Sequence, residues 1–320
     1  MTTPGKRSGC FALGGQKVLK RSDDDLKLVL LDVHPFRRVL ESYATIAQHT
    51  CFKVVRGEKD RWLLEARGED HSHTCIVSAR LLIDKVERAD GDEAKIVGAS
   101  FVLDTNDALA TIRGTMASQQ LHIDALPSIC KVLLGLYNPD SKAHGSLSVL
   151  DCYVDPVTQP PPNILYDEFL LDIEVQCLKE FLSRGGWAKA EYMRITLYTQ
   201  EIASKTYSLL EFSTMKGTFE HRMWFSRETS KHEDGSIVVR AAEDADFESF
   251  SVGEDLKPVY DHSFQIKRIE AFVKGIAARF VVARLKKDEA LLLEQHLAGS
   301  TDDEQHLRFL IALSRHDDDE

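Results

Sequence analysis

The side chains of His71, His73 and Cys75 are the first candidates for chemistry, because they alternate along the chain. Alternate residues of a strand point to the same side, and imidazole and thiolate groups are ligands that zinc prefers. A tetrahedral zinc site needs a fourth ligand, and none stands at a suitable spacing. We therefore predict no metal and no cofactor.

Motifs of catalysis and of nucleotide binding are missing from the sequence. It contains no GxGxxG, no GxxxxGK[ST] and no GxSxG, so neither a phosphate-binding loop nor a nucleophile elbow is indicated. Carboxylates are numerous, but their spacing defines no acid–base pair. His316 with the acidic run Asp317–Glu320 is typical of a solvated tail. We predict that the protein is not an enzyme.

The composition indicates a globular protein with two domains. The chain has 320 residues, of which 43% are hydrophobic and 28% charged, and this length suits two domains of roughly 150 residues each. No apolar run approaches the ~20 residues of a membrane span, and the N-terminus lacks the apolar core of a signal peptide. The six cysteines form no CxxC pair. We expect a soluble intracellular protein with reduced, mostly buried thiols and no membrane partner.

The formal net charge of −11 argues against a surface that is basic throughout. It leaves room for basic residues concentrated on one face, so the positions of lysine and arginine decide whether nucleic acid can bind. Residues 1–22 are rich in glycine, serine and lysine. We interpret this segment as a flexible basic arm.

Hydrophobic periodicity predicts the same order of elements in both halves of the chain. Apolar residues at spacings of three and four predict helices at His34–Ala44, Asp107–Ala117, Val175–Arg184 and Phe264–Lys274. Strands are predicted in the first half at Leu26–Val33, Cys51–Val55, Trp62–Ala66, Thr74–Leu82, Lys95–Leu103, Leu121–Ile123, Ile129–Tyr137 and Ser146–Val154. Those of the second half are Phe169–Ile173, Tyr192–Tyr198, Lys205–Thr214, Phe219–Ser226, Ile237–Ala242, Ala278–Leu285, Ala290–His296 and Leu307–Leu313.

The boundary between the halves is marked by Pro160-Pro161-Pro162, which forbid helix and favour an extended, semi-rigid connection. We divide the chain into the arm (1–22), a first domain (23–154), a connecting loop (155–166) and a second domain (167–320) that ends in the acidic tail.

Several stretches resemble the family of proliferating cell nuclear antigen, the sliding clamps of eukaryotes and viruses. They are Pro35–Glu41, Ser72–Ile76, Leu150–Asp167, Leu307–Leu313 and Asp317–Glu320, and their order and spacing carry the resemblance. It implies an α+β clamp fold in which two similar domains each place two helices on an antiparallel sheet. Subunits of this fold assemble into a ring.

The resemblance also implies a function. A clamp of this family encircles double-stranded DNA without sequence specificity and tethers DNA polymerase and other peptide-motif-bearing replication and repair proteins. We would then expect a homotrimer, placed on DNA by a clamp loader, in the nucleus or in a viral replication factory.

In this family the polar faces of the helices line the DNA channel. The matching basic residues are Arg37, Arg38, Arg113, Lys179, Arg184, Lys189, Lys267, Arg268 and Lys274. Weak phosphate contacts suit sliding, since each firm contact adds affinity without sequence preference. The alternative is that these residues belong to ordinary solvated helix faces.

Partner peptides of the family bind an apolar groove beneath the connecting loop. The matching positions are His73, Thr74, Ile76, Pro162, Ile164, Leu165, Tyr166, Ala290, Leu310, Ile311 and Ala312. Each of these apolar residues could instead belong to the core. By the family pattern, the strand near Ile129–Tyr137 pairs with the strand near Ser208–Met215 of the next subunit, although both could equally be interior strands.

Three other functions stay open at this point. The chain could be one subunit of a heterotrimeric checkpoint clamp, or a herpesvirus-type processivity subunit that grips DNA without closing a ring. It could also be an unrelated α+β enzyme, which a deep pocket with convergent ionisable groups would favour.

Overall fold

A computed structural model describes residues 22–57, 59–115, 119–140, 143–152, 168–187, 189–202, 205–216, 219–228, 230–231, 237–241, 256–276, 278–297 and 305–314. The predicted basic arm, the connecting loop, most of 228–260 and the acidic tail therefore lie outside the described residues.

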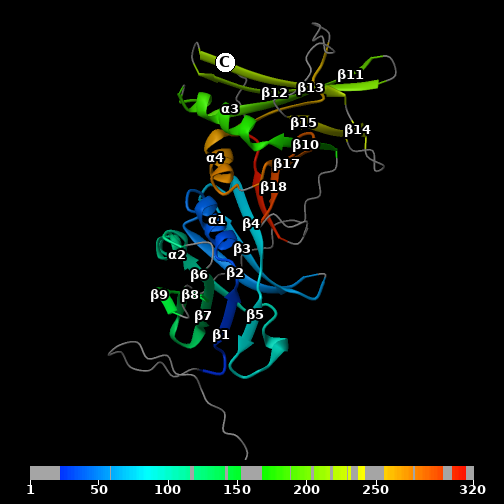
Figure 1. Ribbon diagram of the computed structural model, residues 1–320. Helices are drawn as coiled ribbons and strands as arrows, with labels where there is room; N and C mark the ends of the chain where they lie inside the picture. Colours follow the sequence, from blue (N-terminus) through cyan, green and yellow to red (C-terminus); the bar gives the residue numbers. More distant parts are fainter. Residues whose placement is uncertain are drawn as a thin grey trace, which may run out of the picture.

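The first half of the chain alternates short strands with two helices, as its periodicity predicted (Figure 1). Its elements are β1 (Leu26–Leu30), α1 (His34–Tyr43), β2 (His49–Arg56), β3 (Trp62–Glu69), β4 (Cys75–Leu82), β5 (Lys85–Arg88), β6 (Ser100–Asp104), α2 (Thr105–Ile112), β7 (Gln120–Leu126), β8 (Lys131–Asn138) and β9 (Ala143–Asp151). Short 3₁₀ turns cover Glu93–Lys95 and Pro127–Ile129.

The second half repeats the strand–helix opening and again contains two helices among its described residues. Its elements are β10 (Phe169–Glu174), α3 (Val175–Trp187), β11 (Tyr192–Ile202), β12 (Lys205–Lys216), β13 (Phe219–Glu228), β14 (Ser230–Lys231), β15 (Ile237–Ala241), β16 (Tyr260–Gln265), α4 (Ile266–Lys274), β17 (Phe280–Leu285), β18 (Leu291–His296) and β19 (His306–Ile311). The predicted α+β class is confirmed.

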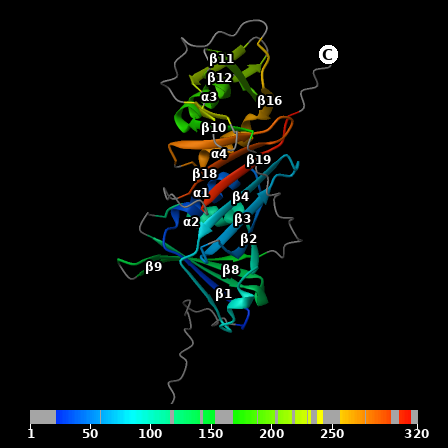
Figure 2. The same ribbon diagram turned by 90° about the vertical axis from the view of Figure 1, so that its right-hand side faces the viewer.

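The described strands form three sheets, and the largest runs through both halves. Its ten strands follow the order β14-β15-β10-β17-β18-β19-β4-β3-β2-β6. The halves join where β19 pairs antiparallel with β4, with Phe309 opposite Val77. Figure 2 shows these two strands side by side at the centre of the molecule. A five-stranded sheet (β5-β1-β7-β8-β9) and a four-stranded sheet (β13-β12-β11-β16) flank it.

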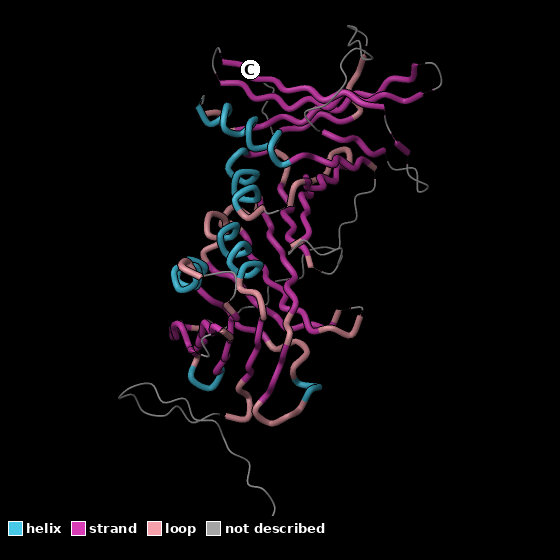
Figure 3. Tube along the Cα trace, in the orientation of Figure 1, coloured by secondary structure: helices cyan, strands magenta, loops and turns pink. Residues whose placement is uncertain are grey.

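The described helices stand in a column along one side of the molecule (Figures 1 and 3). In this column α1 contacts α2 and α4, and α4 contacts α3. Each helix buries one stripe of apolar residues against the sheets, which leaves its opposite face outward. The described helices therefore share one side of the molecule and are not enclosed between the sheets.

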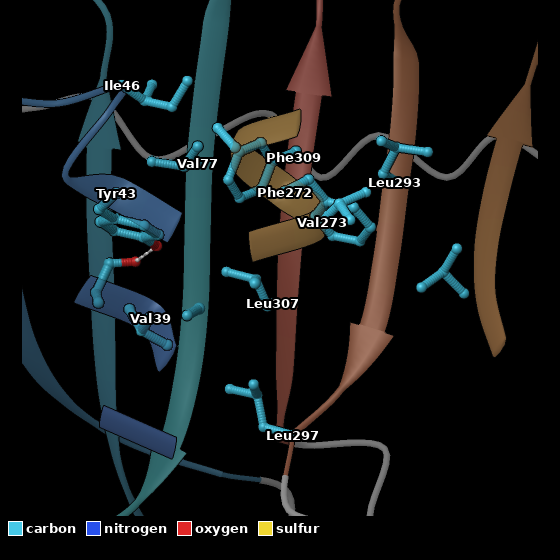
Figure 4. Packing of buried hydrophobic residues seen from close by; sticks show 14 of the residues in the cluster. Val39, Tyr43, Ile46, Val77, Phe272, Val273, Leu293, Leu297, Leu307 and Phe309 are labelled. Atoms are coloured by element: carbon cyan, nitrogen blue, oxygen red, sulfur yellow. Dashed lines mark hydrogen bonds between the residues drawn. The ribbon is translucent and has the colours of Figure 1, made fainter. Parts of the chain in front are cut away.

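The junction of the two halves is a continuous apolar core (Figure 4). Phe272 of α4 packs edge-on against Phe309 of β19, with ring centroids 5.1 Å apart. Tyr43 of α1 is fully buried beside Val77, and its hydroxyl donates to the carbonyl of Ala66 at 3.1 Å. These two contacts meet where Phe309 of β19 stands opposite Val77 of β4, so the two halves share one core and stabilise each other.

Some element predictions were wrong for local reasons. Lys95–Leu103 is not one strand, because the Asp92 carboxylate caps a 3₁₀ turn at the Ala94 amide and the strand begins only at Ser100. Phe264 belongs to β16, and α4 starts two residues later. The strands β5, β14 and β16 were missed.

The prediction of mostly buried thiols was also wrong for the described cysteines. Cys75 and Cys177 are buried, but Cys51 and Cys152 are half-buried and Cys130 is exposed. A thiol is small and only weakly polar, so both environments tolerate it.

Candidate functional surfaces

The helix column presents basic side chains on its outward face. Lysine and arginine are exposed at Arg113, Lys179, Arg184, Lys189, Lys267 and Lys274, which lie in or directly after α2, α3 and α4. We call these six residues the cationic face. All six are among the basic residues that the resemblance named, and they stand in or directly after helices that share one side of the molecule (Figures 1 and 3).

The two arginines of α1 contribute less positive charge to this side. The Nε of Arg37 donates to Oε1 of Glu41 one helical turn later, at 2.8 Å, so its charge is partly neutralised. Arg38 is half-buried. Its carbonyl oxygen lies near Gly275 at the end of α4, so Arg38 borders the junction between the halves.

Arg268 has a different role from the one predicted for it. Its guanidinium binds the carboxylate of Asp70, whose side chain is only 3% exposed, and Arg268 itself is only 18% exposed. The ion pair ties α4 of the second half to the β3–β4 turn of the first half. We therefore leave Arg268 out of the cationic face.

Asp70 is the centre of a dense hydrogen-bond network in this turn. Its Oδ1 accepts from the amides of Thr74 and Cys75, each at 2.8 Å. Its Oδ2 accepts from the hydroxyl of Ser72 at 2.5 Å and from that of Thr74 at 3.0 Å. Burial opposes the charged form, but these hydrogen bonds and the Arg268 charge outweigh it and lower the pKa of Asp70.

The outer face of the ten-stranded sheet, opposite the helices, carries a strip of small and apolar residues. Leu310 of β19 stands opposite Ile76 of β4 and Leu292 of β18. The amide of Ala312 donates to the carbonyl of Thr74 at 2.8 Å and so continues the pairing. Because alternate residues of a strand lie on the same face of a sheet, six residues share this outer face. We call them the apolar strip: Thr74, Ile76, Ala290, Leu292, Leu310 and Ala312.

Five of these six positions were predicted from the sequence, and Leu292 was missed. Leu292 follows Ala290 by two residues in an extended segment, so strand alternation could have identified it. Leu292 is largely buried, whereas Ile76 and Leu310 are half-exposed.

The predicted groove positions Ile311 and His73 lie elsewhere. Ile311 is 1% exposed and pairs with Cys75 and Leu291, which are both buried, so it faces the core. His73 is exposed in the β3–β4 turn, where its Nδ1 lies 2.5 Å from Oε1 of Glu69. Pro162, Ile164, Leu165 and Tyr166 lie outside the described residues.

The alternation that suggested a zinc site is absent from the fold. His73 has a positive φ of 55° in the turn, and the strand starts only at Cys75. Burial raises the pKa of the Cys75 thiol to about 12, so this sulfur disfavours the thiolate form that binds metals. Within the described residues, no group of three His, Cys, Asp or Glu side chains could hold a metal ion.

The strands predicted to join neighbouring subunits are interior strands. β8 lies between β7 and β9, and β12 lies between β11 and β13. Among the described strands the open edges of these sheets are β5 and β9 in one and β13 and β16 in the other. The prediction was wrong because a sequence run shows that a strand exists but not which neighbours it pairs with.

Two of these open edges carry exposed large side chains. Val149 of β9 is 46% exposed and Trp224 of β13 is 42% exposed. Figure 1 shows β9 near one end of the molecule and β13 near the other. An exposed edge strand offers unpaired amide and carbonyl groups to another chain, and exposed apolar side chains beside it favour such a contact.

No helix of the described residues combines the length and the apolar character needed to cross a membrane.

The two related halves, the shared central sheet and the one-sided helix column together define the clamp fold of proliferating cell nuclear antigen. The solved structures that match include the crystal structure of Proliferating Cellular Nuclear Antigen from Entamoeba histolytica, with a TM-score of 0.62 and 15% sequence identity. The match covers 91% of this chain and 99% of that one. No protein-family model and no curated protein sequence matches the chain.

Proposed function

We propose that this protein is a subunit of a DNA sliding clamp, a non-enzymatic ring that encircles duplex DNA. The observation that carries the proposal is the cationic face: exposed lysine and arginine side chains gather on one helix column of a chain whose net charge is −11. Contacts with phosphate through such side chains are independent of base sequence. The acidic remainder would disfavour DNA elsewhere on the surface and guide it toward this face.

Ring closure in this proposal uses β9 of one subunit and β13 of the next. A contact between two different edges of the same chain is heterologous, and it produces a closed ring when the rotation between subunits fits. The positions of the two edges near opposite ends of the molecule support such a head-to-tail contact. We propose a homotrimer that acts in the nucleus or in a viral replication factory and is placed on DNA by a clamp loader.

The apolar strip is the proposed docking site for DNA polymerases and for other replication and repair proteins. Tethering raises the effective concentration of an enzyme at DNA without any chemistry by the tether. Half-exposed Ile76 and Leu310 on adjacent strands suit the apolar anchors of a short peptide. The groove positions of the connecting loop, Ile164 and Leu165 among them, remain part of this proposal.

The decisive experiment combines oligomeric mass with retention on DNA of two topologies. We expect a trimer that, once loaded, stays on closed circular DNA and slides off the same DNA after linearisation. A chain that remains monomeric would contradict the homotrimer and point to a heterotrimeric clamp. A chain that holds linear and circular DNA equally well, with a steep salt dependence, would contradict encirclement and indicate a non-ring processivity subunit.

The edge contact can be tested by Val149→Asp. The carboxylate of an aspartate at this exposed edge position would lose its hydration when the proposed interface forms. We therefore expect the trimer dissociation constant to rise at least tenfold, which is about 1.4 kcal/mol or more of association free energy. The matched control is Val97→Asp, because Val97 is 51% exposed in a loop remote from either edge strand in sequence. Equal trimer dissociation constants for the two variants, measured by sedimentation, would count against β9 as the edge.

The cationic face can be tested by reversing Lys179, Lys267 and Lys274 to glutamate. The slope of log affinity against log salt for duplex DNA should fall by about one for each of these lysines that binds a phosphate. The control reverses three exposed lysines outside the helices, Lys53, Lys85 and Lys287. The proposal requires a smaller slope and an absence of polymerase stimulation only in the first variant, with both oligomers intact.

The apolar strip can be tested by Ile76→Ala together with Leu310→Ala. Removing both anchors should weaken a partner peptide at least tenfold, about 1.4 kcal/mol or more, while DNA encirclement is unchanged. Leu31→Ala is the control, since Leu31 is 54% exposed outside the strip. Peptide affinity is measured by calorimetry, and unchanged affinity in the double variant would remove the strip from the docking site.

A further inference from the structure

The β8–β9 hairpin places two cysteines opposite each other at its open end. Lys131 pairs with Asp151 at the end of the strand register, and Cys130 and Cys152 are the next residues outward on the two sides. One backbone hydrogen bond links the two cysteines, because the amide of Cys152 donates to the carbonyl of Cys130 at 3.0 Å. An ion pair between Lys131 and Asp151 stands directly beside the two cysteines.

This spacing suits a disulfide. The hydrogen bond from the Cys152 amide to the Cys130 carbonyl holds the two backbones against each other, and a disulfide joins residues whose Cα atoms lie roughly 4.4–6.8 Å apart.

The two thiols differ in their access to solvent. Cys130 is exposed and follows the short 3₁₀ turn in a left-handed conformation with φ of 50°. Cys152 is half-buried against the core. Burial raises the pKa of Cys152, which slows its own reaction with an oxidant in solution. An oxidant therefore meets Cys130 first.

We propose that Cys130 and Cys152 form a reversible disulfide when the protein is oxidised by a hydroperoxide. The Cys130 sulfur attacks the peroxide, breaks its O–O bond and becomes a sulfenic acid, with release of water when the peroxide is hydrogen peroxide. The Cys152 sulfur then attacks the sulfenic sulfur and displaces a second water. Two thiols lose two electrons and two protons in total, and the peroxide is reduced.

The bond would act on an open edge of the structure. Among the described strands β9 pairs only with β8, so the register of β9 depends on that one neighbour. A covalent bond between Cys130 and Cys152 fixes the register of β9 against β8 at the open end of the hairpin. Oxidation would therefore stiffen the edge strand through a site separate from the cationic face and the apolar strip.

The test is peroxide treatment of the whole protein, followed by intact mass and by peptide mapping without reduction. We expect the loss of two hydrogen atoms, one linked peptide pair joining Cys130 to Cys152, and restoration of both thiols by dithiothreitol. Cys152→Ser should instead accumulate a sulfenic acid at Cys130 that a dimedone probe traps, and Cys130→Ser should leave Cys152 reduced. Cys51→Ser, which removes another half-buried thiol, should retain the bond.

Three outcomes would overturn the proposal. In the first, the two thiols stay unlinked at a peroxide concentration that oxidises Cys130. In the second, Cys130 or Cys152 forms a disulfide with some other cysteine of the chain. In the third, the disulfide joins two chains and not two residues of one chain. Circular dichroism of each serine variant establishes that it is folded, so a missing bond cannot result from misfolding.

Discussion

Replacing Asp70 by alanine should lower the free energy of unfolding by about 3–5 kcal/mol, the usual cost of removing one partner of a buried ion pair. The change would leave the Arg268 guanidinium without its counter-charge at a position that is only 18% exposed. It would also remove the acceptor for the amides of Thr74 and Cys75. Urea unfolding followed by far-ultraviolet circular dichroism measures the loss.

A double-variant cycle separates the ion pair from the rest of this network. Asp70→Ala leaves the Arg268 charge buried without a partner, and Arg268→Met removes that charge. The double variant should therefore be more stable than the sum of the two single losses predicts. Asp23→Ala is the control, because Asp23 is exposed, and its effect should stay within about 0.5 kcal/mol. Strictly additive losses would show that Asp70 and Arg268 do not interact in solution.

The pH dependence of the free energy of unfolding gives a second test of the role of Asp70. The pKa of Asp70 is lower in the folded protein than its ordinary value of 3.8, so the folded state favours the carboxylate. The resulting stability is fully present above that ordinary value and is lost as the pH falls through the lower folded pKa.

Part of the acid destabilisation of the unmodified protein should therefore disappear in Asp70→Ala. Another part should remain, because the pKa of Glu294 is also lowered: burial opposes the shift, but Arg308 and then His306 and Arg284 outweigh it. An unchanged acid profile in the variant would contradict the Asp70 assignment.

Gly275→Ala should cost about 1–3 kcal/mol, since it forces a methyl group into the contact between α1 and α4. A Cβ at this position would lie 1.8 Å from Oγ of Ser42 and 2.9 Å from the backbone oxygen of Arg38. The serine hydroxyl can rotate away, but the backbone oxygen moves only if the helices separate. The side chain of Gln295 also holds the Gly275 carbonyl, with Nε2 donating at 3.2 Å.

The matched control for this substitution is Gly114→Ala, because a Cβ at Gly114 would meet nothing within 4 Å. That change should be neutral or slightly stabilising, since alanine has less conformational freedom to lose on folding. Adding Ser42→Ala to Gly275→Ala should recover only part of the stability. Thermal unfolding of the four proteins measures the differences, and equal stability of both alanine variants would show that the junction is looser than the structure indicates.

These two predictions concern the place where the helix column is held together. Asp70–Arg268 and Gly275–Ser42 both link α4 of the second half to the first half. The cationic face depends on this link, because α4 carries Lys267 and Lys274 on its outward side. A variant that loosens the junction should therefore weaken DNA retention even though it removes no basic residue of that face.

Local sequence patterns alone determined the order and type of most elements. α1 is a helix because Phe36, Val39, Leu40 and Tyr43 recur at the helical spacing, and all four are fully buried. β4 is a strand because every second residue from Cys75 to Leu81 is buried. Burial of one face imposes a period on a short segment, so the period can be recognised in the sequence without knowing what covers that face.

The assignment of single residues to surfaces needed the tertiary structure. Leu310 and Ile311 are adjacent and both apolar, yet only Leu310 belongs to the apolar strip, and nothing in the local pattern says which of two apolar neighbours turns inward. Arg268 lies on a helix with other basic residues but binds Asp70, which is 198 residues away in the sequence. The open edges at β9 and β13 likewise depend on which strands pair.

The physical reason is the range of the interactions. Helix and strand periods arise from neighbours within a few positions, whereas ion pairs, sheet order and the choice of inner face depend on segments that meet only after the chain has folded. The sequence by itself therefore indicated most of the elements, their repeated order in the two halves, and nine basic residues of which six form the cationic face. Only the folded chain decided which of those side chains remain available to a partner and which hold the two halves together.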